Sequence, residues 1–212
     1  MMSLTDVSFA YRKGGEELFG GLTHEFTPGA VTAVTGPSGR GKSTLLYVLG
    51  LLLTPTTGSV VLDGRPVSHV SDSERAFIRS RRIGFVFQDS ELDPTRKVID
   101  SVVEPALYAG GRRSEQLPRA QELLRRFGLA ERAEHRPGQV SGGQAQRLAV
   151  CRALINSPDV ILADEPTGNL DRDNAALVLD ALTGTARLDA STVIIASHDP
   201  FVLEQVDEVV QL

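Results

Sequence analysis

The chain has 212 residues, of which 41% are hydrophobic and 23% are charged. These proportions are typical of a single globular domain and exclude an intrinsically disordered chain, because enough apolar residues are present to build a core. A net charge of −5 disfavours a duplex-DNA binder, which usually has a basic surface.

The single cysteine, Cys151, excludes an intrachain disulfide and favours a reducing compartment. We interpret it as a small buried hydrophobic residue rather than a catalytic one. The N-terminus lacks the basic and apolar regions of a signal peptide. The longest apolar run, Leu45 to Leu53, is far shorter than the ~20 residues of a membrane span. We therefore expect a soluble chain whose role at a membrane requires a partner.

Short β-type segments alternate with helical segments along the chain. Segments rich in β-branched or aromatic residues are predicted as strands at Val31–Thr35, Val60–Leu62, Ile83–Phe87, Val160–Ala163, Thr192–Ala196 and Val209–Leu212. Val60–Leu62 lies between two glycines and is typical of a hairpin strand. Val160–Ala163 and Thr192–Ala196 are unbroken apolar runs, which are typical of strands buried on both faces.

Between about residues 98 and 155 the pattern becomes mostly helical. Leu123, Leu124 and Phe127 share one helix face at three-to-four spacing, and Gly143–Asn156 has the same character. We therefore predict an α/β core, formed by residues 1–90 and 157–212, that is interrupted by a helical subdomain over about residues 91–156.

The segment Gly36–Ser43 fits the phosphate-loop pattern G-x-x-x-x-G-K-[ST]. Its glycines let the backbone curl so that N–H groups converge on an anion, and the helix predicted over Thr44–Leu53 directs its positive end there. Lys42 is expected to reach the β- and γ-phosphates, and the Ser43 hydroxyl to bind Mg²⁺. A Gly-rich turn without a ligand is the alternative, which the preceding strand and following helix disfavour.

The apolar strand Val160–Ala163 ends in two carboxylates, Asp164 and Glu165. Asp164 is suited to hold Mg²⁺, and Glu165 is suited to polarise a water for attack on the γ-phosphate. Paired acids after a strand are also common as solvated turns, but the phosphate loop upstream favours a nucleotide site.

The segment Val140–Gln144 resembles the signature motif of ABC transporter ATPases, usually written L-S-G-G-Q, with valine in place of leucine. The other motifs of that family follow in its order along essentially the whole chain. The resemblance implies an α/β fold: a P-loop NTPase (RecA-like) core with an antiparallel β subdomain and an inserted α-helical subdomain that carries the signature. Ser141, Gly142 and Gly143 open a helix and offer free N–H groups, which the family places on the γ-phosphate held by the other subunit.

Further residues are assigned by their match to the family's motifs. Tyr11 matches the aromatic residue that stacks on adenine, with edge packing as the alternative. Gln88 matches the Q-loop glutamine, Asp171 the D-loop aspartate, and His198 the switch histidine. The resemblance thus implies catalytic roles for Glu165, His198, Lys42 and Gln88, and Mg²⁺ binding by Ser43, Gln88 and Asp164. The implied ATP-binding set is Tyr11, Gly36, Pro37, Ser38, Gly39, Arg40, Gly41, Lys42, Ser43, Thr44, Ser141, Gly142, Gly143, Gln144 and Asp171.

The resemblance also implies partners. We expect a homodimer with ATP at its interface, bound to a separate integral membrane permease at the cytoplasmic face of the plasma membrane, without nucleic acid. Ile83–Gln88 and Ala163–Asp171 look like the lipoprotein-release, macrolide-export, haem-export and cell-division branch, which favours export or extraction from the membrane. Mechanical regulation of a membrane protein without transport is the alternative. DNA-repair and translation ATPases carry coiled-coil insertions or two ATPase units, and we find neither.

The segment after Gln88 is more acidic than is usual in the family, which leaves the identity of the permease open. We predict that Asp89–Ala109 lines a groove for a cytoplasmic helix of the permease. The predicted contacts are apolar at Leu92, Val98, Val102 and Leu107 and acidic at Asp89, Glu91 and Asp93. The alternative is that the apolar residues pack the subdomain.

Overall fold

The computed structural model describes residues 1–12, 14–90 and 92–212. Its centre is a parallel sheet with the strand order β6-β7-β8-β3-β9. The strands are β3 (Val31–Thr35), β6 (Ile83–Val86), β7 (Val160–Asp164), β8 (Thr192–Ala196) and β9 (Glu208–Gln211). Every residue of β7 and β8 is buried, which explains their unbroken apolar sequences. Because the strands are parallel, the loops after their C-terminal ends meet at one edge of the sheet.

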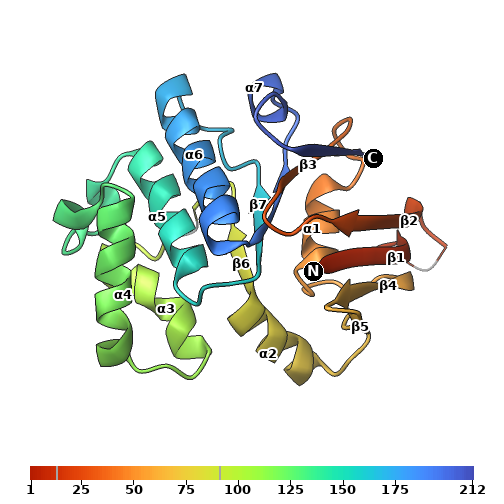
Figure 1. Ribbon diagram of the computed structural model, residues 1–212, viewed down its shortest axis with the longest axis horizontal. Coiled ribbons are helices and arrows are strands. Elements are labelled where there is room, and N and C mark those ends of the chain that lie inside the picture. Colours follow the sequence, from red (N-terminus) through yellow and green to blue (C-terminus); the bar gives the residue numbers. More distant parts are fainter. Residues whose placement is uncertain (13, 91) are drawn as a thin grey trace.

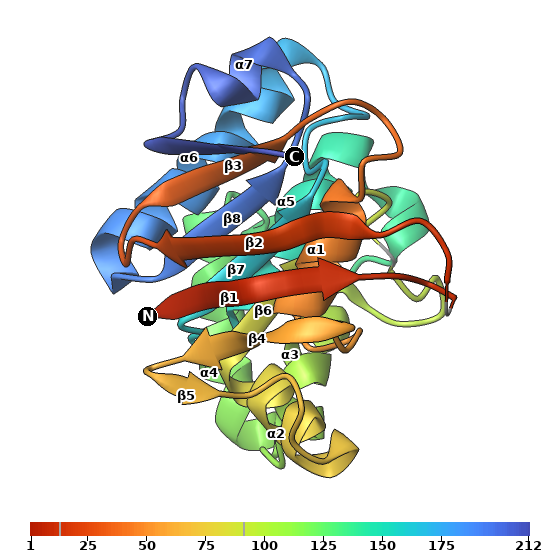
Figure 2. The same ribbon diagram turned by 90° about the vertical axis from the view of Figure 1, so that its right-hand side faces the viewer.

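A second, antiparallel sheet has the order β2-β1-β4-β5. It consists of β1 (Met2–Phe9), β2 (Leu18–Phe26), β4 (Thr57–Leu62) and β5 (Arg65–Pro66). Helix α1 (Lys42–Leu49) lies between this sheet and the parallel one (Figures 1 and 2). Leu45 and Leu46 of α1 pack with Phe26 and Val60 in the core between the two sheets.

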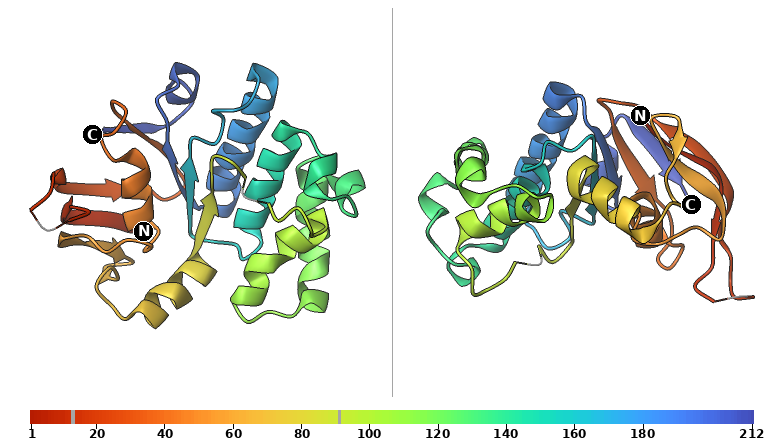
Figure 3. Two further views of the ribbon diagram at one scale, coloured as in Figure 1. Left: turned by 180° about the vertical axis from the view of Figure 1, so that it is seen from behind. Right: turned by 90° about the horizontal axis from the view of Figure 1, so that it is seen from below.

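The segment between β6 and β7 is helical and lies at the opposite end of the molecule from the antiparallel sheet (Figure 1). It holds α3 (Val98–Tyr108), α4 (Arg113–Arg126), two 3-10 turns (Ala130–Arg132 and Pro137–Gln139) and α5 (Gly142–Leu154). The remaining helices are α2 (Asp72–Arg82), α6 (Arg172–Asp189) and α7 (Pro200–Leu203), which Figure 3 shows from behind and below. None of the helices in the described ranges is long and apolar enough to cross a membrane.

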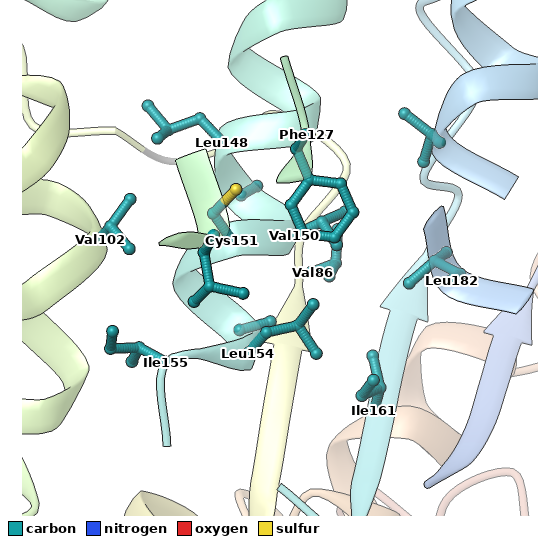
Figure 4. Packing of buried hydrophobic residues seen from close by; sticks show 14 of the residues in the cluster. Val86, Val102, Phe127, Leu148, Val150, Cys151, Leu154, Ile155, Ile161 and Leu182 are labelled. Carbon is teal, nitrogen blue, oxygen red and sulfur yellow. The ribbon is translucent and has the colours of Figure 1, made fainter. Parts of the chain in front are cut away.

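One hydrophobic cluster joins the inserted helices to the parallel sheet. Val102 of α3 and Cys151 of α5 belong to this cluster together with Val86 of β6 and Ile161 of β7 (Figure 4). Burial raises the pKa of the Cys151 thiol well above its usual range, so the thiol stays protonated. The predicted packing role of this cysteine is therefore confirmed.

The predicted strands and the helical insertion are confirmed, and the predicted Leu123, Leu124 and Phe127 face is buried. The helix after the phosphate loop is shorter than predicted. It ends at Leu49 because Leu51 adopts a left-handed backbone (φ 56°) and turns the chain away. Helix α6, the longest helix that the structure describes, is absent from the sequence-based prediction. The subdomain boundaries near residues 91 and 156 stay a prediction.

Candidate functional site

The phosphate loop connects the end of β3 to the start of α1. Gly39 and Gly41 adopt left-handed backbone conformations, with φ angles of 83° and 89°. A Cβ atom at Gly41 would lie 2.9 Å from Leu18 Cδ1, so a side chain there would strain the left-handed backbone and displace the leucine. Lys42 Nζ donates hydrogen bonds to the carbonyl oxygens of Gly36 (3.0 Å) and Pro37 (3.4 Å). The ammonium group is thus held over the loop that the sequence predicts to bind phosphate.

The first residue of the acidic pair lies beside the phosphate loop. The Ser43 hydroxyl donates a hydrogen bond of 3.0 Å to Asp164 Oδ1. Asp164 is 7% exposed, and this burial raises the pKa of its carboxyl group, an effect that the bond from Ser43 opposes. The two predicted Mg²⁺ ligands from β7 and α1 are therefore neighbours, although 121 positions separate them in the sequence.

The second acid, Glu165, is held by two side chains that follow β8. His198 Nδ1 lies 2.7 Å from Glu165 Oε1, and the Ser197 hydroxyl donates a bond of 3.1 Å to Oε2. Glu165 has a left-handed backbone (φ 42°), and its N–H donates to the Ala196 carbonyl. Glu165 and His198 were both predicted from the sequence to act at the nucleotide, whereas Ser197 was not predicted to have a role. Because Ser197 directly precedes His198 in the sequence, its proximity to the site could have been predicted.

These groups border a cleft of about 670 Å³ at the C-terminal edge of the parallel sheet. The cleft combines the phosphate loop with Gln88 after β6, Glu165 after β7 and His198 after β8. Its lining residues are Gly36, Pro37, Ser38, Gly39, Gly41, Lys42, Ser43, Thr44, Gln88, Glu165, Gly168 and His198. Gly168 was not predicted. An anion in the cleft faces the N-terminal end of α1 and the Lys42 ammonium group.

Arg40 and Tyr11, which were predicted to bind ATP beside the phosphate loop, do not line the cleft. Arg40 is exposed on the phosphate loop. Tyr11 is 66% exposed, and its ring contacts the edge of Phe9 with centroids 4.9 Å apart. The Tyr11 hydroxyl is 2.8 Å from Thr44 Oγ1, which does line the cleft. Tyr11 therefore lies next to the phosphate loop, and its contact with adenine stays a prediction.

The signature residues form the start of α5. The Ser141 hydroxyl accepts a hydrogen bond from the Gln144 N–H (3.3 Å), and the Gln144 side chain accepts one from the Ser141 N–H (2.9 Å). Within α5 this arrangement leaves the N–H groups of Gly142 and Gly143 without a helical partner. Ser141 and Gly142 are exposed, and none of the four residues lines the cleft. In one copy of the chain, the signature and the phosphate loop are therefore separate.

Asp171 begins α6 next to the signature. Its carboxylate accepts hydrogen bonds from the Asn174 N–H (2.9 Å) and side-chain amide (2.8 Å), which lower the pKa of Asp171. The Asn174 side chain in turn lies against Gly143, where a Cβ atom would be 2.3 Å from Asn174 Oδ1. The starts of α5 and α6 thus contact each other, and Asp171 also lies outside the cleft.

A second groove, of about 450 Å³, lies between α2, β6 and α3. Its lining includes Phe85 of β6, Phe87 just after that strand, and Glu104, Pro105 and Tyr108 of α3. Phe85 and Phe87 stack with ring centroids 4.4 Å apart. Phe87 lines this groove, and the next residue, Gln88, lines the cleft. A movement of this segment therefore affects both the groove and the cleft.

The residues predicted to contact a permease helix are only partly suited to that role. Val98 and Val102 are 1% and 0% exposed and pack in the subdomain core, so their prediction as contacts is wrong. Leu92 also packs against this core, whereas Leu107 is 40% exposed. Helical spacing alone does not distinguish a core face from a docking face. The acidic contacts at Asp89 and Asp93 stay a prediction, and Glu91 lies outside the described residues.

Known proteins with similar sequences are ATP-binding proteins of transport systems. Residues 19–168 match the family described as ABC transporter. A lipoprotein-releasing system ATP-binding protein, LolD, from Paramagnetospirillum magneticum is 44% identical, and the alignment covers 100% of this chain and 94% of that protein. The macrolide export ATP-binding/permease protein MacB from Syntrophobacter fumaroxidans is 40% identical over 100% of this chain but only 30% of its own length.

Solved structures agree with the sequence comparison. One is an ATP-binding cassette in a dimeric, post-hydrolysis state bound to ADP and Pi. It is 34% identical, with a TM-score of 0.89, and the match covers 100% of this chain and 94% of that chain. The fold of this chain is therefore shared with a related cassette whose structure was solved as a dimer.

Proposed function

The chain belongs to the ABC transporter family as an ATP-binding and ATP-hydrolysing subunit, and from that premise we propose that two copies close around Mg²⁺-ATP and thereby drive a separate membrane permease. The observation that carries the proposal is the arrangement of Lys42, Ser43, Asp164, Glu165 and His198 around one edge of the sheet. Phosphoryl transfer requires a cationic cradle, a metal and a positioned water-activating group, and this edge offers residues for each.

Magnesium fits the residues present. Ser43 and Asp164 are in hydrogen-bond contact, and Gln88 lines the same cleft, so hard oxygen donors converge there. The raised pKa of Asp164 marks a desolvated carboxylate, which a bound cation would stabilise. In the described ranges, no three His, Cys, Asp or Glu side chains gather to hold a metal by themselves. Ser43, Asp164 and Gln88 would hold Mg²⁺ together with the nucleotide's phosphates, and the ion would supply positive charge that offsets the charge of the phosphates.

Glu165 is proposed as the group that takes up a proton from the attacking water. Its two oxygens are fixed by His198 and Ser197, so the carboxylate has one orientation in the cleft. Holding a catalytic group in the correct orientation lowers the activation free energy of the reaction substantially. His198 is 75% exposed, which leaves its ring free to contact a γ-phosphate. Lys42, held over the loop by backbone carbonyls, is proposed to turn to the phosphates when ATP binds.

The signature is proposed to complete the site of a second copy. Ser141 and Gly142 are exposed at the positive end of α5 but do not line the cleft of their own chain. A two-fold axis brings each signature to the other copy's cleft and makes two equivalent composite sites. Support comes from the dimeric state of the related cassette bound to ADP and Pi.

The groove between α2, β6 and α3 is proposed to receive a cytoplasmic helix of the permease. The stacked rings of Phe85 and Phe87 in its lining suit the apolar face of a helix. Glu104 and Tyr108 at its rim are hydrogen-bonded to each other and suit polar partners. The names of the relatives favour lipoprotein release or macrolide export over mechanical regulation without transport. The chain would then act at the cytoplasmic face of the membrane.

Tyr108→Ala tests the groove against a matched control. Tyr108 is 73% exposed in the groove, and Leu188 is 77% exposed on α6, away from it. Tyr108→Ala should reduce co-purification with the permease of the native cell, whereas Leu188→Ala should not. Equal recovery of the permease with both variants would place its contact elsewhere.

Mixed dimers test the composite site. Ser141→Arg and Lys42→Ala should each inactivate the chain alone. Their mixture contains dimers in which one site carries both defects and the other site carries none, so part of the ATPase activity should return. A mixture as inactive as its components, with mixed dimers verified by pull-down, would contradict a site shared between copies.

A further inference from the structure

The turn that carries Gln88 is held at both ends by one side chain from the signature helix. The Ser90 N–H donates to the Phe87 carbonyl (3.2 Å) and closes a β-turn with Gln88 and Asp89 at its corner. Gln146 of α5 reaches this turn across the interior. Its Nε2 donates to the Phe87 carbonyl (3.1 Å), and its Oε1 accepts from the Ser90 hydroxyl (2.6 Å).

Both side chains of this clamp are buried. Gln146 is 3% exposed and Ser90 is 7% exposed, so water does not replace a lost bond there. Ser90 also adopts a left-handed backbone (φ 59°), which is uncommon for a residue other than glycine. The hydroxyl bond to Gln146 therefore holds the turn in a conformation that its own backbone disfavours.

The clamp joins two parts of the proposed site that belong to different copies of the dimer. Gln88 lines the cleft of its own chain. Gln146 lies on the helix whose start, at Ser141, presents the signature to the other copy. A helix of 13 residues moves as a rigid unit, so a shift of the signature carries Gln146 with it.

We propose that Gln146 is a positioning residue, which sets Gln88 in the ATP cleft and couples its position to that of the signature helix. The inference rests on the proposed role of Gln88 in hydrolysis. This coupling links the two ATP sites of the dimer. When the signature of one copy engages ATP in the partner's cleft, its helix α5 moves. Gln146 on that helix then shifts the turn at Gln88 in the cleft of its own chain.

Substitutions at the clamp separate positioning from binding. Gln146→Leu keeps the size of the side chain and removes both bonds, and Ser90→Ala removes only the hydroxyl. Gln116→Leu on α4 is the matched control, because it is the same change on another helix of the subdomain. We expect both clamp variants to lower kcat about 10- to 100-fold, as misplacement of a catalytic group does. The Kd for ATP should not change, because the phosphate loop is untouched.

The decisive experiment repeats Gln146→Leu in a Gln88→Ala chain. A residue that acts through Gln88 has nothing to position once Gln88 is lost, so the second substitution should not slow hydrolysis further. The same loss of rate in both backgrounds would make Gln146 a structural residue and overturn the proposal. If Gln146→Leu does not fold, Ser90→Ala is measured in the same two backgrounds.

The reference variants distinguish this inference from the proposed function. Wild-type turnover in Gln88→Ala would remove the role of Gln88 itself. Slow turnover in Gln88→Ala, together with normal turnover in Gln146→Leu and Ser90→Ala, would refute the clamp alone.

Discussion

Gly143 lies where the start of α5 contacts the start of α6. A Cβ atom there would lie 2.3 Å from Asn174 Oδ1 and 3.0 Å from Asn174 Cβ. The Asn174 side chain can give way only by losing its 2.8 Å hydrogen bond to Asp171 Oδ2. We therefore predict that Gly143→Ala destabilises the folded chain, although alanine is the better helix former.

The magnitude follows from two opposing effects. Overpacking and the loss of one hydrogen bond cost about 1–3 kcal/mol. Replacing glycine by alanine in a helix returns up to about 1 kcal/mol. The expected net loss in the free energy of unfolding therefore lies between about 0 and 3 kcal/mol, with a central value of about 1.5 kcal/mol. Gly142→Ala is the matched control, because nothing lies within 4 Å of a Cβ atom at that position.

Urea denaturation without nucleotide, followed by circular dichroism, measures both variants. Gly142→Ala should keep or slightly increase stability. Adding Asn174→Ala removes the obstructing amide, so Gly143→Ala should cost about 1 kcal/mol less in that background. Equal losses at positions 142 and 143, or strict additivity with Asn174→Ala, would refute the contact between the two helix starts.

Three further predictions concern single residues. Lys42→Ala should abolish hydrolysis and weaken ATP binding, because a cation is lost from the phosphate cradle; normal turnover would refute the phosphate-loop assignment. Ser141→Ala should reduce the free energy of unfolding by about 1 kcal/mol, since α5 loses its capping hydroxyl; unchanged urea stability would argue against the cap. Cys151 should react with a thiol reagent at pH 8 only as fast as the chain unfolds, because burial raises the pKa of its thiol. Rapid labelling of the native chain would contradict that burial.

The phosphate loop was predictable because its chemistry lies in one short segment. The segment contains the glycines with left-handed backbones together with the lysine and the serine, so the pattern is visible without knowledge of the fold. Glu165 and His198 were predictable for another reason. Each follows an apolar run typical of a buried parallel strand, and the carboxyl ends of such strands share one edge.

Contacts between distant segments could not be predicted in this way. Gln146 and Phe87 are 59 positions apart, and no local pattern indicates that a glutamine on α5 reaches that turn. The close contact at Gly143 could not be predicted either. The sequence predicts that Gly143 offers a free N–H group at the start of a helix, but not that the Asn174 side chain packs against it. Val98 has the apolar character of a docking residue, and only the packed structure shows that it belongs to the core.

The central claim is that ATP joins two copies through composite sites, and Glu165→Gln tests it most directly. The amide keeps the shape of the side chain but does not take up a proton, so hydrolysis should slow by about 10²-fold or more while ATP still binds. Light scattering after size exclusion should then find a dimer with Mg²⁺-ATP and a monomer without nucleotide. Adding Ser141→Arg to the same chain should return it to a monomer. A Glu165→Gln chain that binds ATP yet stays monomeric, alone and with the permease present, would contradict the account.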